Sequence, residues 1–407
     1  MARRRTVWTA GTVALVTPLL LAGCGAGAGQ STDDSADTLR ILDSHTSEPN
    51  AGIWRAAIDA CAEPLGVEIE QEAVPGDTLI SKVLQQASSK TLPDVLMLDN
   101  PDLQEIAATG ALAPLSDFGV EPAGISDGIL AASTYEGEVY ALQPVTNTLA
   151  LFYNKTLFAE AGLEPPTTWD ELKETALAFA DGDRYGLAMS NTNSYEGTWQ
   201  FLPFMWSNGG DEADIATPET AAALQLLKDL QDSGAMSKST VTWGQGDAAD
   251  QFAAGNAAMM VNGPWNFGSL DQVEGLDYGI VPIPVPSAGD TPIGPFGGEV
   301  WAVPQTGNAE KQQKAAELVA CLASDEQQVA LATGTGTVPT NPDLADQVVA
   351  SNPKLEIFAD MVPNLRARTG ELGTEWPKAA TKIYTAVQNT LVQNVAPEAA
   401  LEAAQNG

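Results

Sequence analysis

Carboxylates, amides and tryptophans recur in the loops beside five predicted strands of this 407-residue chain. The loops follow Leu42, Leu98 and Val261, and they precede Leu149 and Trp301. The side chains they contribute are Asp43, Ser44, His45, Glu48, Asp99, Asn100, Asn147, Asn262, Trp265, Glu299 and Trp301. Carboxylates and amides hydrogen-bond hydroxyl groups, and aromatic faces pack against the C–H side of a pyranose ring. The recurrence therefore predicts a site for a neutral sugar.

Each of these residues also has an ordinary structural explanation. A loop aspartate or asparagine often caps a helix or completes a turn, and a single tryptophan usually belongs to the core. Because the same chemistry recurs at five strand ends, one shared site is favoured over five unrelated structural roles.

The rest of the composition restricts the chemistry further. His45 is the only histidine, which excludes a histidine-rich zinc site, and no Gly-x-Ser-x-Gly sequence stands out to serve a histidine-dependent nucleophile. We therefore expect no metal and no cofactor. The 53 acidic residues outnumber the 19 basic ones and give a formal net charge of −34. A chain this acidic repels nucleic-acid phosphates and anionic lipid headgroups, which excludes both as binding partners.

Predicted strands and helices alternate in the part of the chain that positions the first loops. Strands at 38–42, 67–70 and 94–98 alternate with helices at 51–65, 79–88 and 101–110. Later strands are predicted at 138–142, 149–153, 258–261, 278–281 and 298–303, around a helical region at 168–181, 197–208 and 221–233. This pattern predicts an α/β fold with a mostly parallel sheet, in which ligands bind beyond the carboxyl ends of the strands.

The first 24 residues have the features of a lipoprotein export signal. Arg3 to Arg5 precede an apolar run from Val13 to Ala22, which is shorter than the ~20 residues of a membrane-spanning helix. Leu21-Ala22-Gly23-Cys24 resembles the bacterial lipobox, in which the cysteine is diacylated and becomes the mature N-terminus. An ordinary cleaved signal peptide is the alternative. The arginines leave Sec and twin-arginine export both open.

A lipid on Cys24 would anchor the protein to the cell membrane on its extracytoplasmic side. Residues 24–38 are small and polar without periodicity, so they are expected to form a flexible tether between this anchor and a folded body. Cys61 and Cys321 remain. Export would place them in an oxidising compartment, where they either form one disulfide or stay as two buried thiols.

Three sets of segments, two pairs and one single run, resemble one known family. They are Pro93–Asn100 followed by Ala108–Leu115, Asn147–Lys155 with Pro165–Leu172, and Phe252–Trp265. All resemble extracellular solute-binding protein family 1, the sugar-binding lipoproteins of ABC importers, a group that includes maltose-binding protein. The third segment is the most specific, and the resemblance extends from residue 38 to the end of the chain.

This resemblance implies a periplasmic-binding-protein-like fold of type II with two hinge-linked lobes, each a mostly parallel sheet flanked by helices. After a signal peptide at 1–23, the N-lobe would hold residues 39–145 and 297–335, and the C-lobe residues 146–296 and 336–407. A carbohydrate, namely an oligo- or disaccharide, would bind between the lobes, which close on it by a hinge motion. The transmembrane subunits of an ABC permease would recognise the closed form. The implied protein is a monomer and not an enzyme.

The resemblance also assigns hydrogen-bonding residues to the site. Asp99 and Asn100 match the loop that supplies hydrogen bonds from the first lobe. Asn147 falls at the crossover between lobes, where maltose-binding protein has a glutamate. This departure weakens any assignment of maltose as the ligand.

The aromatic candidates come from the same comparison. Trp265 matches the main stacking aromatic of the family, Trp199 matches an aromatic of the second lobe, and Trp376 matches a late aromatic with a shifted register. Loop position alone adds the last candidates, which are Trp243, Glu299, His45 and Glu48.

Other solutes and other classes of protein stay in view. A ligand carboxylate or phosphate usually requires an arginine fork, and the arginines after the leader are predicted to lie away from the candidate loops. These are Arg40, Arg55, Arg184, Arg366 and Arg368. A polyamine, which needs aromatics and carboxylates, is the rival ligand. A glycoside hydrolase needs two carboxylates ~5–9.5 Å apart, and no catalytic motif frames such a pair. A structural or adhesion lipoprotein would not need the carboxylates, amides and tryptophans that recur in these loops.

Overall fold

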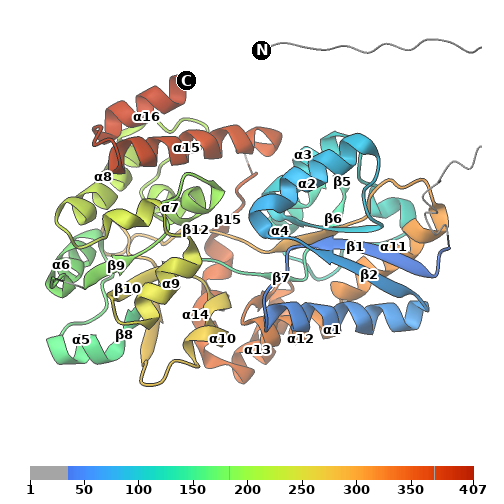
Figure 1. The fold of residues 1–407 in the computed structure, drawn as a ribbon, viewed down its shortest axis with the longest axis horizontal. Helices are drawn as coiled ribbons and strands as arrows, with labels where there is room; N and C mark the ends of the chain where they lie inside the picture. Colours follow the sequence, from blue (N-terminus) through green and yellow to red (C-terminus); the bar gives the residue numbers. More distant parts are fainter. Residues whose placement is uncertain (1–34, 183, 371) are drawn as a thin grey trace, which may run out of the picture. The chain divides into compact units, whose positions relative to one another are not determined.

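The strands of the chain form two main sheets, each with its own set of helices (Figure 1). The computed structural model describes residues 35–182, 184–370 and 372–407. Cys24 and the rest of the expected leader lie outside the described residues. Among the described residues, no helix is long and apolar enough to cross a membrane.

The first sheet has five strands in the order β2-β1-β3-β13-β6. Their bounds are Glu68–Ala73, Thr38–Asp43, Val95–Asp99, Glu299–Ala302 and Ala141–Leu142. β1 pairs in parallel with β2 and β3, whereas β13 pairs antiparallel with β3 and β6. The apolar run of β3 is buried from Val95 to Leu98, as expected for a strand covered on both faces. Its helices include α1 (Asn50–Ala62), α2 (Gly76–Ser89), α3 (Leu103–Ala108), α11 (Ala309–Leu322) and α12 (Asp325–Thr335).

The second sheet has four strands in the order β11-β8-β10-β9. Their bounds are Tyr278–Val281, Ala150–Asn154, Ala257–Asn262 and Tyr185–Ala188. β8 runs against both of its neighbours, and β10 pairs in parallel with β9. Its helices include α5 (Lys155–Ala161), α6 (Trp169–Phe179), α7 (Tyr195–Ser207), α8 (Pro218–Asp232), α9 (Gln245–Ala253), α15 (Trp376–Leu391) and α16 (Pro397–Asn406).

The predicted α/β class is confirmed, but the two main sheets are mixed and not mostly parallel: one strand in each runs against both of its neighbours, so four of their seven pairings are antiparallel. These strands, β13 and β8, are the ones that the chain forms directly after it passes from one sheet to the other. The sequence prediction missed β9, which is only four residues long and contains Gly186, a weak strand former. The single strand predicted at 138–142 is divided into two short strands, Glu138–Val139 and Ala141–Leu142, which pair with different neighbours. The other predicted elements are present with ends shifted by a few residues.

Short ladders join the segments that run between the two sheets. β7 (Val145–Thr146) pairs with β14 (Val338–Pro339), and β12 (Gly294–Pro295) pairs with β15 (Leu365–Arg366). The amide of Gln143 donates to the carbonyls of Val145 (3.0 Å) and Gly297 (2.8 Å). Four stretches that are distant in sequence therefore meet where the chain crosses. Helices α10 (Phe267–Leu270), α13 (Ala345–Ser351) and α14 (Glu356–Met361), with α4 (Asp127–Ala132) and strands β4 (Thr134–Tyr135) and β5 (Glu138–Val139), complete the fold.

A disulfide joins Cys61 of α1 to Cys321 of α11, with 5.7 Å between their Cα atoms. The sequence had left a disulfide and two free thiols as alternatives. In the structure the bond ties two helices of the five-stranded sheet that come from opposite ends of the chain.

Candidate functional site

Two carboxylates meet at the carboxyl end of β3. Asp99 is the last residue of β3 and Glu299 is the first of β13, and they are direct partners across the antiparallel pair. Side chains of such partners lie on the same face of a sheet. Burial raises the pKa of Glu299 to about 7, and the negative charge of Asp99 adds to this effect. Both residues were predicted to belong to the site.

The guanidinium of Arg368 pairs with the carboxylate of Asp99. Its Nη1 donates to Oδ2 of Asp99 at 2.9 Å and its Nη2 donates to Oδ1 at 2.7 Å, which makes a two-pronged pair. The Arg368 side chain is 5% exposed, whereas that of Asp99 is 48% exposed. Asp99 is thus held on one side and open on the other. The guanidinium also lies over the ring of Trp199, 4.5 Å from its centre.

Asn100 is fully buried and belongs to the support of the site. Its Nδ2 donates to the carbonyl of Gly298 at 3.0 Å, and Nη2 of Arg368 is 3.4 Å from its Oδ1. The side chain therefore links the end of β3 to the crossing segment that leads into β13.

Asn147 and Trp199 meet at Gly297. The Gly297 amide donates to the carbonyl of Asn147 at 2.8 Å. A Cβ atom on Gly297 would lie 2.3 Å from Oδ1 of Asn147 and 2.7 Å from the Trp199 ring. Any side chain at position 297 would have to displace these groups. Because glycine has no side chain, the Asn147 side-chain amide and the Trp199 ring can lie close together here. Trp199 itself is only 7% exposed.

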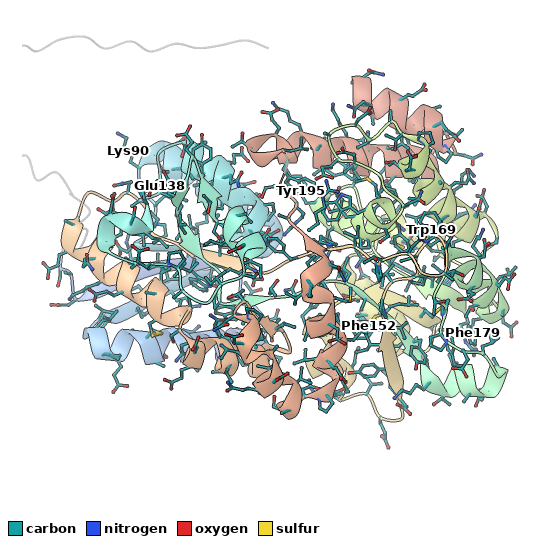
Figure 2. All side chains as sticks on the ribbon, turned by 180° about the vertical axis from the view of Figure 1, so that it is seen from behind. Lys90, Glu138, Phe152, Trp169, Phe179 and Tyr195 are labelled. Carbon is teal, nitrogen blue, oxygen red and sulfur yellow. A yellow bond between two sulfur atoms is a disulfide. The ribbon has the colours of Figure 1, made fainter. Side chains whose placement is uncertain are left out.

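Asp102 and Tyr195 extend the site between the two sheets. Asp102 ends the 3-10 turn Asn100–Asp102, and burial, with the charge of Asp99 next in weight, raises its pKa to about 7. Tyr195 begins α7 and lies on the side of that helix toward the five-stranded sheet (Figure 2). Burial raises the pKa of Tyr195 to about 12, and the charge of Asp102 contributes. The two groups therefore face each other from different halves of the fold.

Trp265 lies at the carboxyl end of β10, in the 3-10 turn Pro264–Asn266. Its ring is half-buried and packs on the backbone of Gly263, where a Cβ atom would fall 1.9 Å from the ring. The preceding Asn262 is fully buried, and its Nδ2 donates to the carbonyl of Gln245 at 2.9 Å. Asn262 therefore shapes the loop, and Trp265 is the partly exposed aromatic on it.

His45 and Glu48 lie in the first loop, where both have structural contacts. The His45 ring stacks on Trp54 with 4.6 Å between centres, and its backbone N–H donates to Oδ1 of Asp43 at 3.0 Å. Burial lowers the pKa of His45 to about 4, so the ring is neutral near pH 7. Oε2 of Glu48 accepts the Gly52 amide at 3.0 Å at the start of α1, although the residue is exposed.

Trp376 and Trp243 both pack against other parts of the protein. Trp376 begins α15, is 1% exposed and packs in the core of the four-stranded sheet. Trp243 packs edge-on against Tyr185, with 6.2 Å between ring centres. Trp243 precedes α9, whose first residue, Gln245, accepts the Asn262 Nδ2–H at the end of β10, so its backbone lies near the strand end that carries Trp265.

Arg368 is the site residue that sequence reasoning missed. The expectation that every arginine lies away from the candidate loops was wrong for this residue, because it contacts Asp99 directly. It follows β15, a two-residue strand that no apolar pattern marks. The only signal in the sequence was the alternation in Leu365-Arg366-Ala367-Arg368. It places the two arginines two residues apart, which is the repeat of a strand.

The geometry supports binding of a polar ligand between the sheets. A half-exposed carboxylate, an amide and a partly exposed tryptophan are offered by Asp99, Asn147 and Trp265. Among the described residues, no group of three or more His, Cys, Asp or Glu side chains is arranged to hold a metal ion.

Comparisons with known proteins give the relatives of this chain. A sequence model described as bacterial extracellular solute-binding protein matches residues 56–357. The maltooligosaccharide ABC transporter solute-binding lipoprotein of Streptococcus pneumoniae strain R6 is 26% identical over 404 residues, covering 93% of this chain and 91% of the relative.

Two solved structures share the whole fold. An ABC transporter solute-binding protein from Thermotoga lettingae, bound with α-D-tagatose, has a TM-score of 0.81 at 25% identity and covers 91% of this chain and 98% of its own. The cyclic α-maltosyl-1,6-maltose binding protein from Arthrobacter globiformis has a TM-score of 0.76 at 27% identity, with coverage of 91% and 97%.

Proposed function

This chain belongs to the bacterial extracellular solute-binding protein family, and from that premise we propose that it captures an oligo- or disaccharide for an ABC importer. It has the two-lobed fold of periplasmic binding proteins, with one sheet in each lobe. Its relatives are binding proteins and not enzymes. The relatives named above bind a maltooligosaccharide, a cyclic maltosyl-maltose and tagatose, which supports a sugar as the solute here.

The observation that carries the proposal is the pairing of Arg368 with Asp99. An anionic ligand would need a guanidinium whose terminal nitrogens are free to bind it, but both terminal nitrogens of this one donate to Asp99. What remains open to a ligand is the outer side of Asp99, the Asn147 amide and the Trp265 ring. These groups suit hydroxyls and the apolar face of a sugar ring.

In this proposal Asp99, Asn147 and Glu299 bond hydroxyl groups, and Trp265 stacks on a ring. Asn100 supports the loop. His45 and Glu48 border the first loop, and their contacts with Trp54 and the start of α1 give them a structural part. The burial of Trp376 leaves it outside the proposed contacts, and the packing of the Trp243 ring against Tyr185 gives it a structural part.

The proposed transport cycle follows from the fold. Residues 39–145 with 297–335 would move against residues 146–296 with 336–407 about the crossing ladders. Closure on the sugar would shift the population toward the form that the permease subunits bind. A lipid on Cys24 would keep this monomer at the outer face of the membrane.

A polyamine is the second candidate ligand. Burial, and next the negative charge of Asp99, raises the pKa of both Asp102 and Glu299, so these carboxyl groups lie near Asp99, which favours a cationic ligand if all three were ionised. Because Asp102 and Glu299 have pKa values of about 7, this charge is only partly present at neutral pH. The sugar is therefore preferred.

Thermal unfolding of residues 25–407 against a ligand panel tests the proposal. The panel contains maltodextrins, trehalose, cello-, xylo- and galacto-oligosaccharides, and spermidine. A ligand at 100 times its Kd adds ~2.7 kcal/mol of stability, which is easily measured. We expect a shift with one saccharide series. A shift with spermidine and with no saccharide would replace the sugar by a polyamine.

A further inference from the structure

Two arginines of one short segment make the same pair of contacts. The guanidinium of Arg366 lies over the Trp206 ring, 5.0 Å from its centre, and its Nη2 is 3.1 Å from Oε1 of Glu212. The guanidinium of Arg368 lies over the Trp199 ring and pairs with Asp99. Each arginine thus has a tryptophan of α7 on one side and a carboxylate on another. We call these contacts the Arg366 clamp and the Arg368 clamp.

The spacing of the residues explains why two clamps form. Trp199 and Trp206 are seven residues apart on α7, which places them on one face, about 10 Å apart along the axis. Arg366 is the last residue of β15, and Arg368 lies two residues later in the turn that the Gly370 N–H closes on the Ala367 carbonyl at 3.3 Å. The segment therefore lies along α7 with one guanidinium over each ring.

The two clamps differ in the carboxylate that completes them. Glu212 is 1% exposed and follows α7 in the chain, and it also accepts the Trp206 Nε1–H at 2.8 Å. The Arg366 clamp is therefore internal to the half that contains α7. Asp99 ends β3 of the other sheet, so the Arg368 clamp joins the two halves at the proposed site.

We propose that Arg368 is a positioning residue of the sugar site: Trp199 holds its guanidinium and the guanidinium fixes the Asp99 carboxylate, so Trp199 acts through Arg368 and not by stacking on a sugar. This inference rests on the proposed function and adds the selectivity of the same site. Trp199 is 7% exposed and already has a cation over its ring, so little of its surface is left for a ligand. Asp99 is half-exposed, so it is the group of the clamp that reaches the sugar.

The Arg368 guanidinium acts on the site in two ways. A carboxylate held at both oxygens loses little conformational freedom when a ligand arrives, which is the usual benefit of preorganisation. The same cation lowers the pKa of Asp102 and of Glu299, against the effects of burial and of Asp99. The other groups that act on these carboxyls are Glu105, Asp43 and Tyr195.

Double-substituted proteins separate positioning from direct contact, with maltotriose as the probe in titration calorimetry. Arg368→Gln should weaken binding roughly 10-fold, which is typical when the partner of a ligating group is lost. In an Asp99→Asn background the same substitution should change the Kd less than ~2-fold, because its target is gone. An equal loss in both backgrounds would mean that Arg368 touches the sugar, and the proposal would be wrong.

Trp199 is tested in the same way. Trp199→Leu should weaken maltotriose binding in the natural chain and leave it unchanged in the Arg368→Gln background. A loss that persists without Arg368 would show direct stacking on the sugar and overturn the assignment. Arg368→Lys, which keeps the charge but loses the fork, should recover only part of the affinity.

The matched control is the second clamp. Arg366→Gln breaks contacts of the same chemistry that do not reach Asp99, so it should lower thermal stability and leave the Kd unchanged. If burial of Glu212 without a partner prevents folding, Arg366→Lys retains a cation there. An equal loss of affinity from either clamp would mean that both act only through overall stability.

A measurement without any sugar keeps this proposal separate from the proposed function. In NMR of the ligand-free protein, the Arg368 Nη–H protons that bind Asp99 should exchange slowly, and Trp199→Leu and Asp99→Asn should each accelerate their exchange. Arg368→Gln should raise the titration midpoint of Glu299, and Arg366→Gln should not. Failure of maltotriose to bind would count only against the proposed sugar ligand and not against the positioning role of Arg368. Unchanged exchange and an unchanged Glu299 midpoint would overturn the positioning role.

Discussion

Single side chains set the strength of binding in the proposed cleft, and Trp265 is the aromatic best placed for it. Its ring is half-buried on Gly263 at the end of β10. Trp265→Ala should cost about 2 kcal/mol or more, roughly 30-fold in Kd, because an aromatic anchor would be removed. Calorimetry with the saccharide found in the panel measures this. Trp169→Ala removes a partly buried ring whose Nε1–H donates to the Pro284 carbonyl at 3.1 Å at the start of α6, and it should leave the Kd unchanged.

Glu299 makes stability depend on pH in a specific direction. Its folded pKa of about 7 lies above the usual value near 4.5, so the folded state keeps a proton that the unfolded state releases between these values. This group therefore lowers the free energy of unfolding as pH rises from about 4.5 to 7. Glu299→Gln removes the effect. The free energy of unfolding of the variant, relative to that of the natural chain, should therefore be higher at pH 8 than at pH 5.

Denaturant titrations of both proteins at the two pH values check this. His45, with a folded pKa of about 4, acts with the opposite sign between about pH 6.5 and 4, but it is common to both proteins and cancels. A constant difference for Glu299→Gln would contradict the raised pKa.

At the scale of elements, the crossing ladders depend on Gly297. Gly297→Ala should destabilise the protein by about 1–3 kcal/mol and weaken ligand binding, because the new methyl group meets Asn147 and Trp199. Denaturant unfolding and calorimetry measure the two effects. Gly246→Ala in α9 is the matched change, because its Cβ would meet no atom within 4 Å and the residue lies in a helix. That change should stabilise by about 0.5–1 kcal/mol.

The elements also show what the sequence could and could not predict. Strands with an apolar run, such as Val95–Leu98, and loops with an unusual polar residue, such as Asp99, are visible without a structure. Pairing between distant segments is not, because it depends on how the chain returns. β15 is two residues long, and nothing local marks it as the partner of β12. Arg368 follows that strand, so the site lacked one residue in the prediction for the same reason.

At the scale of the whole molecule, the Cys61–Cys321 bond constrains most of the chain. The two residues are 260 positions apart, so the bond restricts a very large loop in the unfolded state. Its removal by Cys61→Ser with Cys321→Ser should lower the free energy of unfolding by about 2–5 kcal/mol. Denaturant unfolding of the double variant checks this, and treatment of the natural chain with a reductant should give a similar loss.

Binding should be far less affected. Both cysteines lie on α1 and α11 in the first lobe, and neither contacts the residues proposed to meet the ligand. A double variant that keeps its stability but loses affinity would contradict the structural role of this bond.

The strand order of the first sheet has a consequence for the order in which the protein folds. β13 lies between β3 and β6, although it is made long after both. Until residues 299–302 emerge, β6 has no partner in this sheet, and β3 is paired on one side only, with β1. All four strands of the second sheet lie between Ala150 and Val281, so they are available earlier. Contacts this far apart in sequence form slowly, so the five-stranded sheet should be completed after the four-stranded one.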